Sequence, residues 1–247
     1  MQYRCIRLSE TDSTNTVLRQ LAMQNAPEGT VVIADHQSAG RGRMGRSFLS
    51  PAGTGLYMSL LLRPTIPAAQ AIRITTAAAV AVCRALERMG CDGRIKWVND
   101  IFFRERKICG ILAESALAAD GSLAYAVLGI GVNVAPPADG FAPEIADIAG
   151  AAFEDPPPDA RDRLAETILT EFAPLYARIG EARAAHMAEY RRRCFLLGET
   201  ITVHPLSGEN AYESTAVDVD DECGLLIRLP GGEMRTLSSA EVRVRGK

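Results

Sequence analysis

Two hydrophobic periodicities alternate along the chain and predict a protein that combines helices with strands. Apolar residues recur every three or four positions over 14–25 and again over 69–90, which predicts two amphipathic helices. Asp12 or Ser13 can cap the first helix, and Gly90 suits the end of the second. Runs of β-branched and other apolar residues predict strands at 30–37, 55–64, 94–103, 107–116 and 123–134.

The second half of the chain changes pattern twice. Residues 136–159 are rich in Pro, Ala and acidic residues and predict an irregular crossing, whereas 161–179 and 181–194 again show helical spacing. After these helices, short apolar runs alternate with Gly, Asp and Asn turns, which is typical of a small β-barrel. We expect an α+β fold in which 1–196 form a mixed β-sheet flanked by helices and 197–247 form the barrel.

Composition excludes several classes of protein. Of the 247 residues, 47% are hydrophobic and 23% charged, as in a globular protein of one or two domains. The 27 Lys and Arg residues against 30 Asp and Glu give a net charge of −3, which argues against a protein that coats nucleic acid with its whole surface. No apolar run approaches the roughly 20 residues of a membrane span, so we expect no membrane partner. The first residues also lack the apolar core of a secretory signal.

The cysteines predict reduced thiols rather than disulfides or a zinc site. None of the six stands in a CxxC pair, and three histidines are too few to complete a zinc set. Scattered free thiols are typical of the cytoplasm, where we expect this protein. The cysteines are Cys5, Cys83, Cys91, Cys109, Cys194 and Cys223.

A glycine- and arginine-rich segment follows the predicted strand 30–37. Its residues 40–45 spell GxGxxG, yet the next residues start no helix and the following strand carries no acid for a ribose, so a dinucleotide site is disfavoured. Arg41, Arg43 and Arg46 instead place three positive charges together with no acidic residue nearby. Arginine suits phosphate and carboxylate groups. On this segment alone a ligand-binding loop remains open, and so does a solvated basic loop or a nonspecific nucleic-acid patch.

A second basic region surrounds the only tryptophan, within the segment KWVND at 96–100. Lys107 follows it by eleven residues, after a short turn that predicts a hairpin. Lys96 and Lys107 meet in such a hairpin only if the register allows. Further along, Gly129 and Gly131 take alternate positions of a strand, which leaves either a slot on one face or a bulge.

The chain shows neither a Ser/His/Asp set nor a pair of catalytic carboxylates, and we favour a structural role for His36. Several Arg and Lys residues without a nucleophile suit phosphoryl or nucleotidyl transfer, in which positioning and charge stabilisation carry the reaction.

Taken together, these segments resemble biotin–protein ligases. The resemblance covers about 8–135 and rests on five motifs in order, with Val98 in the third where the family usually has proline. The motifs are DSTN at 12–15, Gln37 with GRGRMGR at 40–46, KWVND at 96–100, RKICGIL at 106–112 and GIGVN at 129–133.

The resemblance implies a class II synthetase-like fold and a two-step reaction. Biotin and MgATP would give biotinyl-5′-adenylate and pyrophosphate, and a lysine of the biotin carboxyl carrier protein of acetyl-CoA carboxylase would then take the biotin. Lys107 and Arg43 would be catalytic. Biotin would contact Ser13, Thr14, Asn15, Gln37, Gly40, Arg41, Gly42, Arg43, Lys107, Gly110 and Gly129. ATP and the adenylate would contact Arg41, Arg43, Arg46, Lys96, Trp97, Asn99, Asp100, Lys107, Gly131 and Asn133. Mg²⁺ would arrive with ATP, without protein side chains as ligands.

Two alternatives stay beside this interpretation: a lipoate–protein ligase or lipoyl transferase, and a noncatalytic sensor of biotinyl-adenylate. The combination of DSTN with GRGRxGR favours biotin over lipoate. Because the DSTN motif begins at Asp12, we expect no N-terminal DNA-binding domain and no DNA partner. The sequence leaves monomer and homodimer open.

Overall fold

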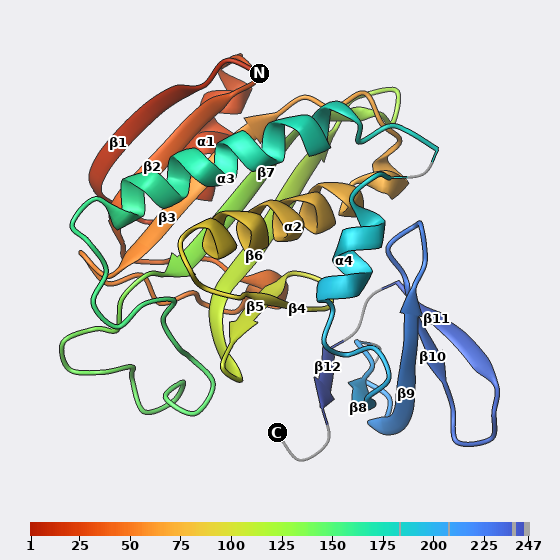
Figure 1. Cartoon of the computed structure of the whole chain (residues 1–247). Coiled ribbons are helices and arrows are strands. Elements are labelled where there is room, and N and C mark those ends of the chain that lie inside the picture. Colours follow the sequence, from red (N-terminus) through yellow and green to blue (C-terminus); the bar gives the residue numbers. More distant parts are fainter. Residues whose placement is uncertain (183, 207, 239–240, 245–247) are drawn as a thin grey trace.

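The computed structural model of the chain describes residues 1–182, 184–206, 208–238 and 241–244. A seven-stranded mixed sheet lies at its centre, in the order β1-β2-β3-β7-β6-β5-β4 (Figure 1). The β1–β2 pair is parallel and the other pairs are antiparallel. The strands are β1 Arg4–Thr11, β2 Thr30–Gln37, β3 Gly55–Leu62, β4 Arg94–Lys96, β5 Asp100–Phe103, β6 Arg106–Leu117 and β7 Leu123–Asn133.

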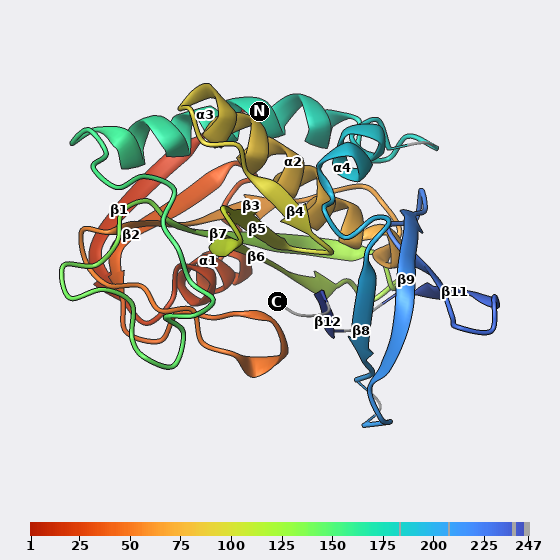
Figure 2. The same ribbon diagram turned by 60° about the horizontal axis from the view of Figure 1, so that its bottom comes forward.

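Helices cover both faces of this sheet. Helices α2 (Ile72–Arg88) and α3 (Ala160–Ala177) lie on one face, and α1 (Thr14–Met23) lies on the other (Figure 2). We call the second face the α1 face. By length and hydropathy alone the segment Ala68–Arg88 would suit a membrane span, which the sequence did not lead us to expect. Its most apolar stretch is 72% buried in the protein, as a core helix is.

A second, antiparallel sheet follows the short helix α4 (Met187–Arg193) and lies beside the first (Figure 1). Its order is β11-β10-β9-β8-β12, and among the described strands no pairing joins β11 to β12, so the predicted barrel is here an open sheet. The strands are β8 Thr200–His204, β9 Tyr212–Val219, β10 Leu225–Arg228, β11 Met234–Leu237 and β12 Glu241–Val244.

Three local predictions were wrong, each for a physical reason. Strand β1 was not predicted, because this edge strand is exposed along most of its length and shows no apolar alternation. The predicted strand 94–103 is instead β4, a turn and β5, with a cis peptide between Trp97 and Val98. Both turn residues are buried, so the apolar pattern runs through the turn. Helix α4 begins at Met187 rather than near 181.

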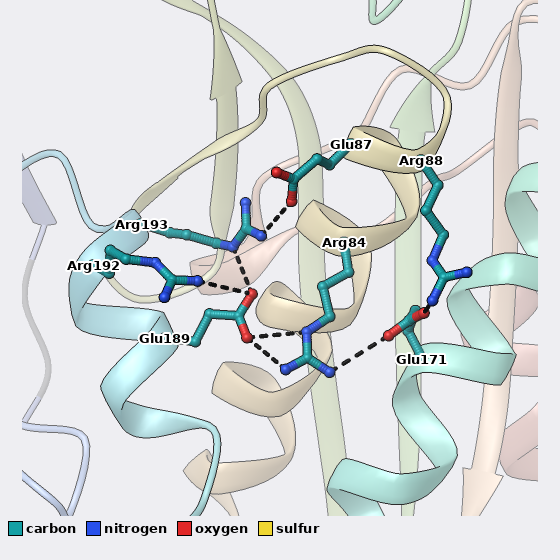
Figure 3. A network of polar contacts seen from close by, with 7 residues as sticks. All are labelled: Arg84, Glu87, Arg88, Glu171, Glu189, Arg192 and Arg193. Carbon is teal, nitrogen blue, oxygen red and sulfur yellow. Dashed lines mark hydrogen bonds and ion pairs between the residues drawn. The ribbon is translucent and has the colours of Figure 1, made fainter.

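Ion pairs join α4 to α2, and α2 to α3 (Figure 3). The Glu189 carboxylate accepts hydrogen bonds from Arg84 and from Arg193, with Nε of each at 3.0 and 2.9 Å respectively. Arg84 also pairs with the buried Glu171, and Arg193 pairs with Glu87. The network fixes α4 against the helical layer, and α4 leads directly into the second sheet.

Helix α4 and the turn between β9 and β10 are also bonded to the turn between β4 and β5. The Trp97 indole Nε1 donates to the Cys223 carbonyl at 2.9 Å, and the Tyr190 hydroxyl donates to the Val98 carbonyl at 3.1 Å. The buried Arg73 of α2 pairs with Glu222 at 2.9 Å. The turn that carries the KWVND motif is therefore packed between the two sheets.

We expect stability to fall in mild acid because of His186, which is buried next to Thr76. Burial, with help from the Arg73 and Arg84 charges, lowers the pKa of His186 to about 4. Between the ordinary histidine pKa near 6.5 and pH 4, His186 is protonated in the unfolded chain but not in the folded protein. The free energy of unfolding therefore rises with pH in this window. Urea unfolding at pH 7 and pH 5 should differ by about 2 kcal/mol from this group. The variant His186→Gln should lose most of that difference, and an unchanged difference would contradict the assignment.

Candidate functional site

A cavity of about 160 Å³ opens on the α1 face, where the loop after β2 passes beneath the sheet in Figure 2. All but two of the residues proposed from the sequence line it, although they come from segments more than a hundred residues apart. Those that line it are Ser13, Thr14, Asn15, Gln37, Arg41, Gly42, Arg43, Arg46, Lys96, Trp97, Asn99, Asp100, Lys107, Gly110, Gly129 and Gly131.

One end of the cavity is lined by uncharged polar groups at the start of α1. Ser13 is the N-cap residue of α1, without a side-chain cap bond, and Thr14 donates through its backbone N–H to Oε1 of Gln37 at 2.9 Å. The Gln37 amide nitrogen donates to the Ser50 hydroxyl at 2.8 Å. Ser59, which the sequence analysis missed, contacts Thr14 at 2.7 Å from the middle of β3. A lone serine within the apolar run GLYMSLLL was the available signal.

Glycines form the floor of the cavity. Gly110 of β6 pairs with Gly131 of β7, so neither strand raises a side chain there. The Phe48 ring packs over this pair: a Cβ on Gly131 would lie 2.6 Å from the ring, and one on Gly110 would lie 3.3 Å from it. Of the two readings left open for Gly129 and Gly131, the slot is therefore the one observed, and Phe48 reaches into it. No sequence pattern pointed to Phe48.

The other end of the cavity is cationic. The register of β4, β5 and β6 brings Lys96 opposite Asp100 and Phe102 opposite Lys107, so both lysines reach the cavity. Nζ of Lys107 pairs with the Asp100 carboxylate at 2.7 Å. The Lys107 backbone is bonded to residues 148 and 150 of the irregular crossing, which therefore lies against this end.

The glycine–arginine loop is attached to the sheet by its arginines. Arg43 Nη1 donates to Oδ1 of Asn99 at 3.0 Å, and Arg41 Nη2 pairs with Glu114 of β6 at 2.9 Å. Positive φ values occur at Met44 (60°) and Gly45 (72°), where the loop turns back. Only glycine adopts such a φ without strain, which explains Gly45.

Two predicted site residues lie outside the cavity. Gly40 packs against the backbone of Phe48, where a Cβ would lie 2.2 Å from the carbonyl oxygen. Asn133 stands at the end of β7 and donates through Nδ2 to the Gly150 carbonyl at 3.0 Å. Each supports a loop beside the cavity. His36 lies outside the cavity lining, with its side chain 38% exposed and its Nδ1 3.4 Å from Glu10.

The arrangement suits a ligand with a neutral polar end and an anionic end. Lysine and arginine side chains stand where negative charge would collect, and such preorganised cations stabilise phosphoryl-type transition states. Among the described residues no group of three or more His, Cys, Asp and Glu could hold a metal ion. All six cysteines are unpaired, and burial raises the pKa of the Cys194 thiol to about 11, so that thiol is no nucleophile.

Comparisons with known families agree with this geometry. Residues 8–133 match the profile of the Biotin/lipoate A/B protein ligase family, and 196–245 match that of the Biotin protein ligase C terminal domain. A Biotin–[acetyl-CoA-carboxylase] ligase of Paracoccus denitrificans is 34% identical over 95% of this chain and 98% of its own length. The ligase of the same name from Mycobacterium tuberculosis is 31% identical over 95% and 86%.

Other similarities cover less of the relative or concern structure. The Bifunctional ligase/repressor BirA of Bacillus subtilis is 45% identical over 56% of this chain, which spans 42% of that protein's length. The biotin protein ligase from Aquifex aeolicus in complex with biotin and ATP superposes with a TM-score of 0.80 at 28% identity, over 98% of this chain and 99% of that one.

Proposed function

Because the chain belongs to the Biotin/lipoate A/B protein ligase family, we propose that it is a biotin–protein ligase, which activates biotin with ATP and transfers it to a carrier protein. The observation that carries the proposal is that residues of all five sequence motifs line one cavity. The fifth motif contributes Gly129 and Gly131. Relatives matched over nearly their whole length carry the name of this activity.

In the first step the biotin carboxylate attacks the α-phosphorus of ATP, a P–O bond forms, and pyrophosphate leaves. Two anions must approach each other, so cations must offset their repulsion. Lys107 and Arg43 stand at the cationic end for this purpose. Arg46 and Lys96 add positive charge around it, while the uncharged end near Thr14 and Gln37 offers hydrogen bonds to the ureido ring.

In the second step a lysine amine of the biotin carboxyl carrier protein attacks the mixed anhydride, and AMP leaves with the bonding electrons. The glycine–arginine loop around residues 40–46, called the Gly–Arg loop below, keeps water from the anhydride until the amine arrives. Mg²⁺ is expected with the phosphates of ATP, where it neutralises charge. We propose that the reaction takes place in the cytoplasm, and the six unpaired cysteines support this proposal.

The test is mass spectrometry of the small molecules formed from protein, MgATP and biotin, with parallel mixtures that contain lipoate or no acid. A biotinyl-AMP peak that is absent with lipoate is the expected result. A lipoyl-AMP peak instead would favour the lipoate branch, which the family profile also includes. Binding of biotin without either adenylate would favour a sensor.

Replacing Gly129 with alanine should weaken biotin binding about tenfold, since overfilling a packed site costs 1–3 kcal/mol. The new Cβ would lie 2.3 Å from Oδ1 of the buried Asn15. Titration of the Trp97 fluorescence measures the affinity, because the only tryptophan lines the cavity. Gly231→Ala is the control, since a Cβ there meets nothing within 4 Å. Equal affinity of both variants would contradict the placement of biotin.

A further inference from the structure

Glu114 carries no role in the proposed reaction, yet it is bonded to two parts of the site at once. It lies on β6, four residues after Gly110 and on the same side of the strand. Its Oε1 pairs with Arg41 of the Gly–Arg loop at 2.9 Å, and its Oε2 accepts a hydrogen bond from Nδ2 of Asn15 at 2.9 Å.

The bond to Asn15 fixes the orientation of a buried amide. Asn15 is 4% exposed, and its Oδ1 lies 2.6 Å from the hydroxyl of the buried Ser59. Because a carboxylate accepts hydrogen bonds only, Glu114 requires the NH₂ side of the amide to face it. The oxygen of Asn15 is thereby turned toward Ser59 and Gly129, at the uncharged end of the cavity.

The bond to Arg41 attaches the loop to the sheet. The loop folds on itself through the bridge between Arg41 and Ser47, and Gly42 donates to the Arg46 carbonyl. Arg41 therefore belongs to the part of the loop that covers the cavity. Its side chain is 39% exposed and that of Glu114 is 28% exposed, so the pair is partly shielded from water.

We propose that Glu114 is a positioning residue that keeps the Gly–Arg loop closed through Arg41 and orients Asn15 toward the uncharged end of the cavity. The part that concerns retention of the adenylate rests on the proposed function. The part that concerns the loop does not, because the contacts exist without a ligand.

The variant Glu114→Gln separates the two contacts. The glutamine oxygen still accepts from Asn15, whereas the charge that pairs with Arg41 is gone. Trypsin cuts after arginine, so loop opening is read from fragments that begin at Gly42, Met44 or Ser47. We expect Glu114→Gln to be cut in this loop about fivefold faster than the parent without ligand, with biotin affinity within twofold by Trp97 fluorescence. Biotinyl-adenylate should dissociate about fivefold faster.

Two further variants complete the test. Glu114→Ala removes both contacts and should also weaken biotin binding. Asp162→Asn breaks the exposed ion pair at 2.7 Å between Arg7 of β1 and Asp162 of α3 and should leave cleavage in the loop unchanged. Loop cleavage of Glu114→Gln at the parental rate would overturn the proposal, and so would faster cleavage with unchanged adenylate dissociation. If the parent forms no adenylate, the proposed function fails while the cleavage experiment still decides the role of Glu114.

Discussion

Lys107→Ala should lower the rate of adenylate formation by about 10²- to 10³-fold, the usual effect of removing one charge that stabilises a transition state. Lys107 brings its ammonium group to the cationic end of the cavity and pairs there with Asp100 at 2.7 Å. Its removal takes away a cation and also leaves the Asp100 carboxylate, 22% exposed, uncompensated beside the phosphates. Pyrophosphate release measures the rate.

The two effects can be separated. Lys107→Ala should also weaken ATP binding, because the Asp100 carboxylate then repels the phosphates. In the double variant Lys107→Ala with Asp100→Asn this repulsion is gone, so ATP affinity should recover while the rate of adenylate formation stays low. The control is Arg104→Ala, a cation of the same hairpin that is 77% exposed and lies outside the cavity lining. Pyrophosphate release by Lys107→Ala at the parental rate would refute the assignment of Lys107.

Glu189→Ala should lower the free energy of unfolding by about 2 kcal/mol, since it takes away one of the two carboxylate partners of Arg84 and of Arg193 and leaves their partly buried charges less compensated. Glu189 is 14% exposed and lies between Arg84 and Arg193 (Figure 3). Burial raises the pKa of its carboxyl, but the hydrogen bonds from these arginines outweigh that effect and hold the pKa below its ordinary value. The stabilisation is thus complete above the ordinary pKa near 4.5 and is lost as pH falls through the lower folded value.

Urea unfolding at pH 7 measures this loss. Glu181→Ala is the matched control, because its pair with Arg178 is exposed on both sides and such pairs contribute under about 1 kcal/mol. Equal losses in both variants would show that burial of the network does not matter.

Much of the site could be predicted because its chemistry lies in residue types. Arginines among glycines, a lysine at a strand start and glycines at alternate strand positions each left a structural interpretation open, but together and in order they resemble the motifs of a family and so indicate a function. Phe48 and Glu114 could not be found in this way. Phe48 reaches the glycine floor only because of the path of its loop, and Glu114 meets Arg41 only because of the length of β6.

The fold shows the same difference between features that local sequence patterns reveal and features that depend on contacts with distant segments. Period and composition identified α1, α2 and most strands of the central sheet, because their buried faces repeat regularly. The same patterns did not reveal the turn at Trp97 and Val98, because these side chains are as buried as those of a central strand. Asn133 shares the strand period of Gly131, but at the strand end it is bonded to Gly150 instead of lining the cavity. Neighbours from distant segments decided these cases.

The hydrogen bonds from Trp97 to Cys223 and from Tyr190 to Val98 have a consequence for how the molecule unfolds. The turn between β4 and β5 cannot loosen without losing its bonds to α4 and to the turn between β9 and β10, so we expect the central and C-terminal sheets to unfold as one cooperative unit. Ligand that tightens the cavity therefore adds its binding free energy to the stability of a sheet that contributes little to the cavity wall.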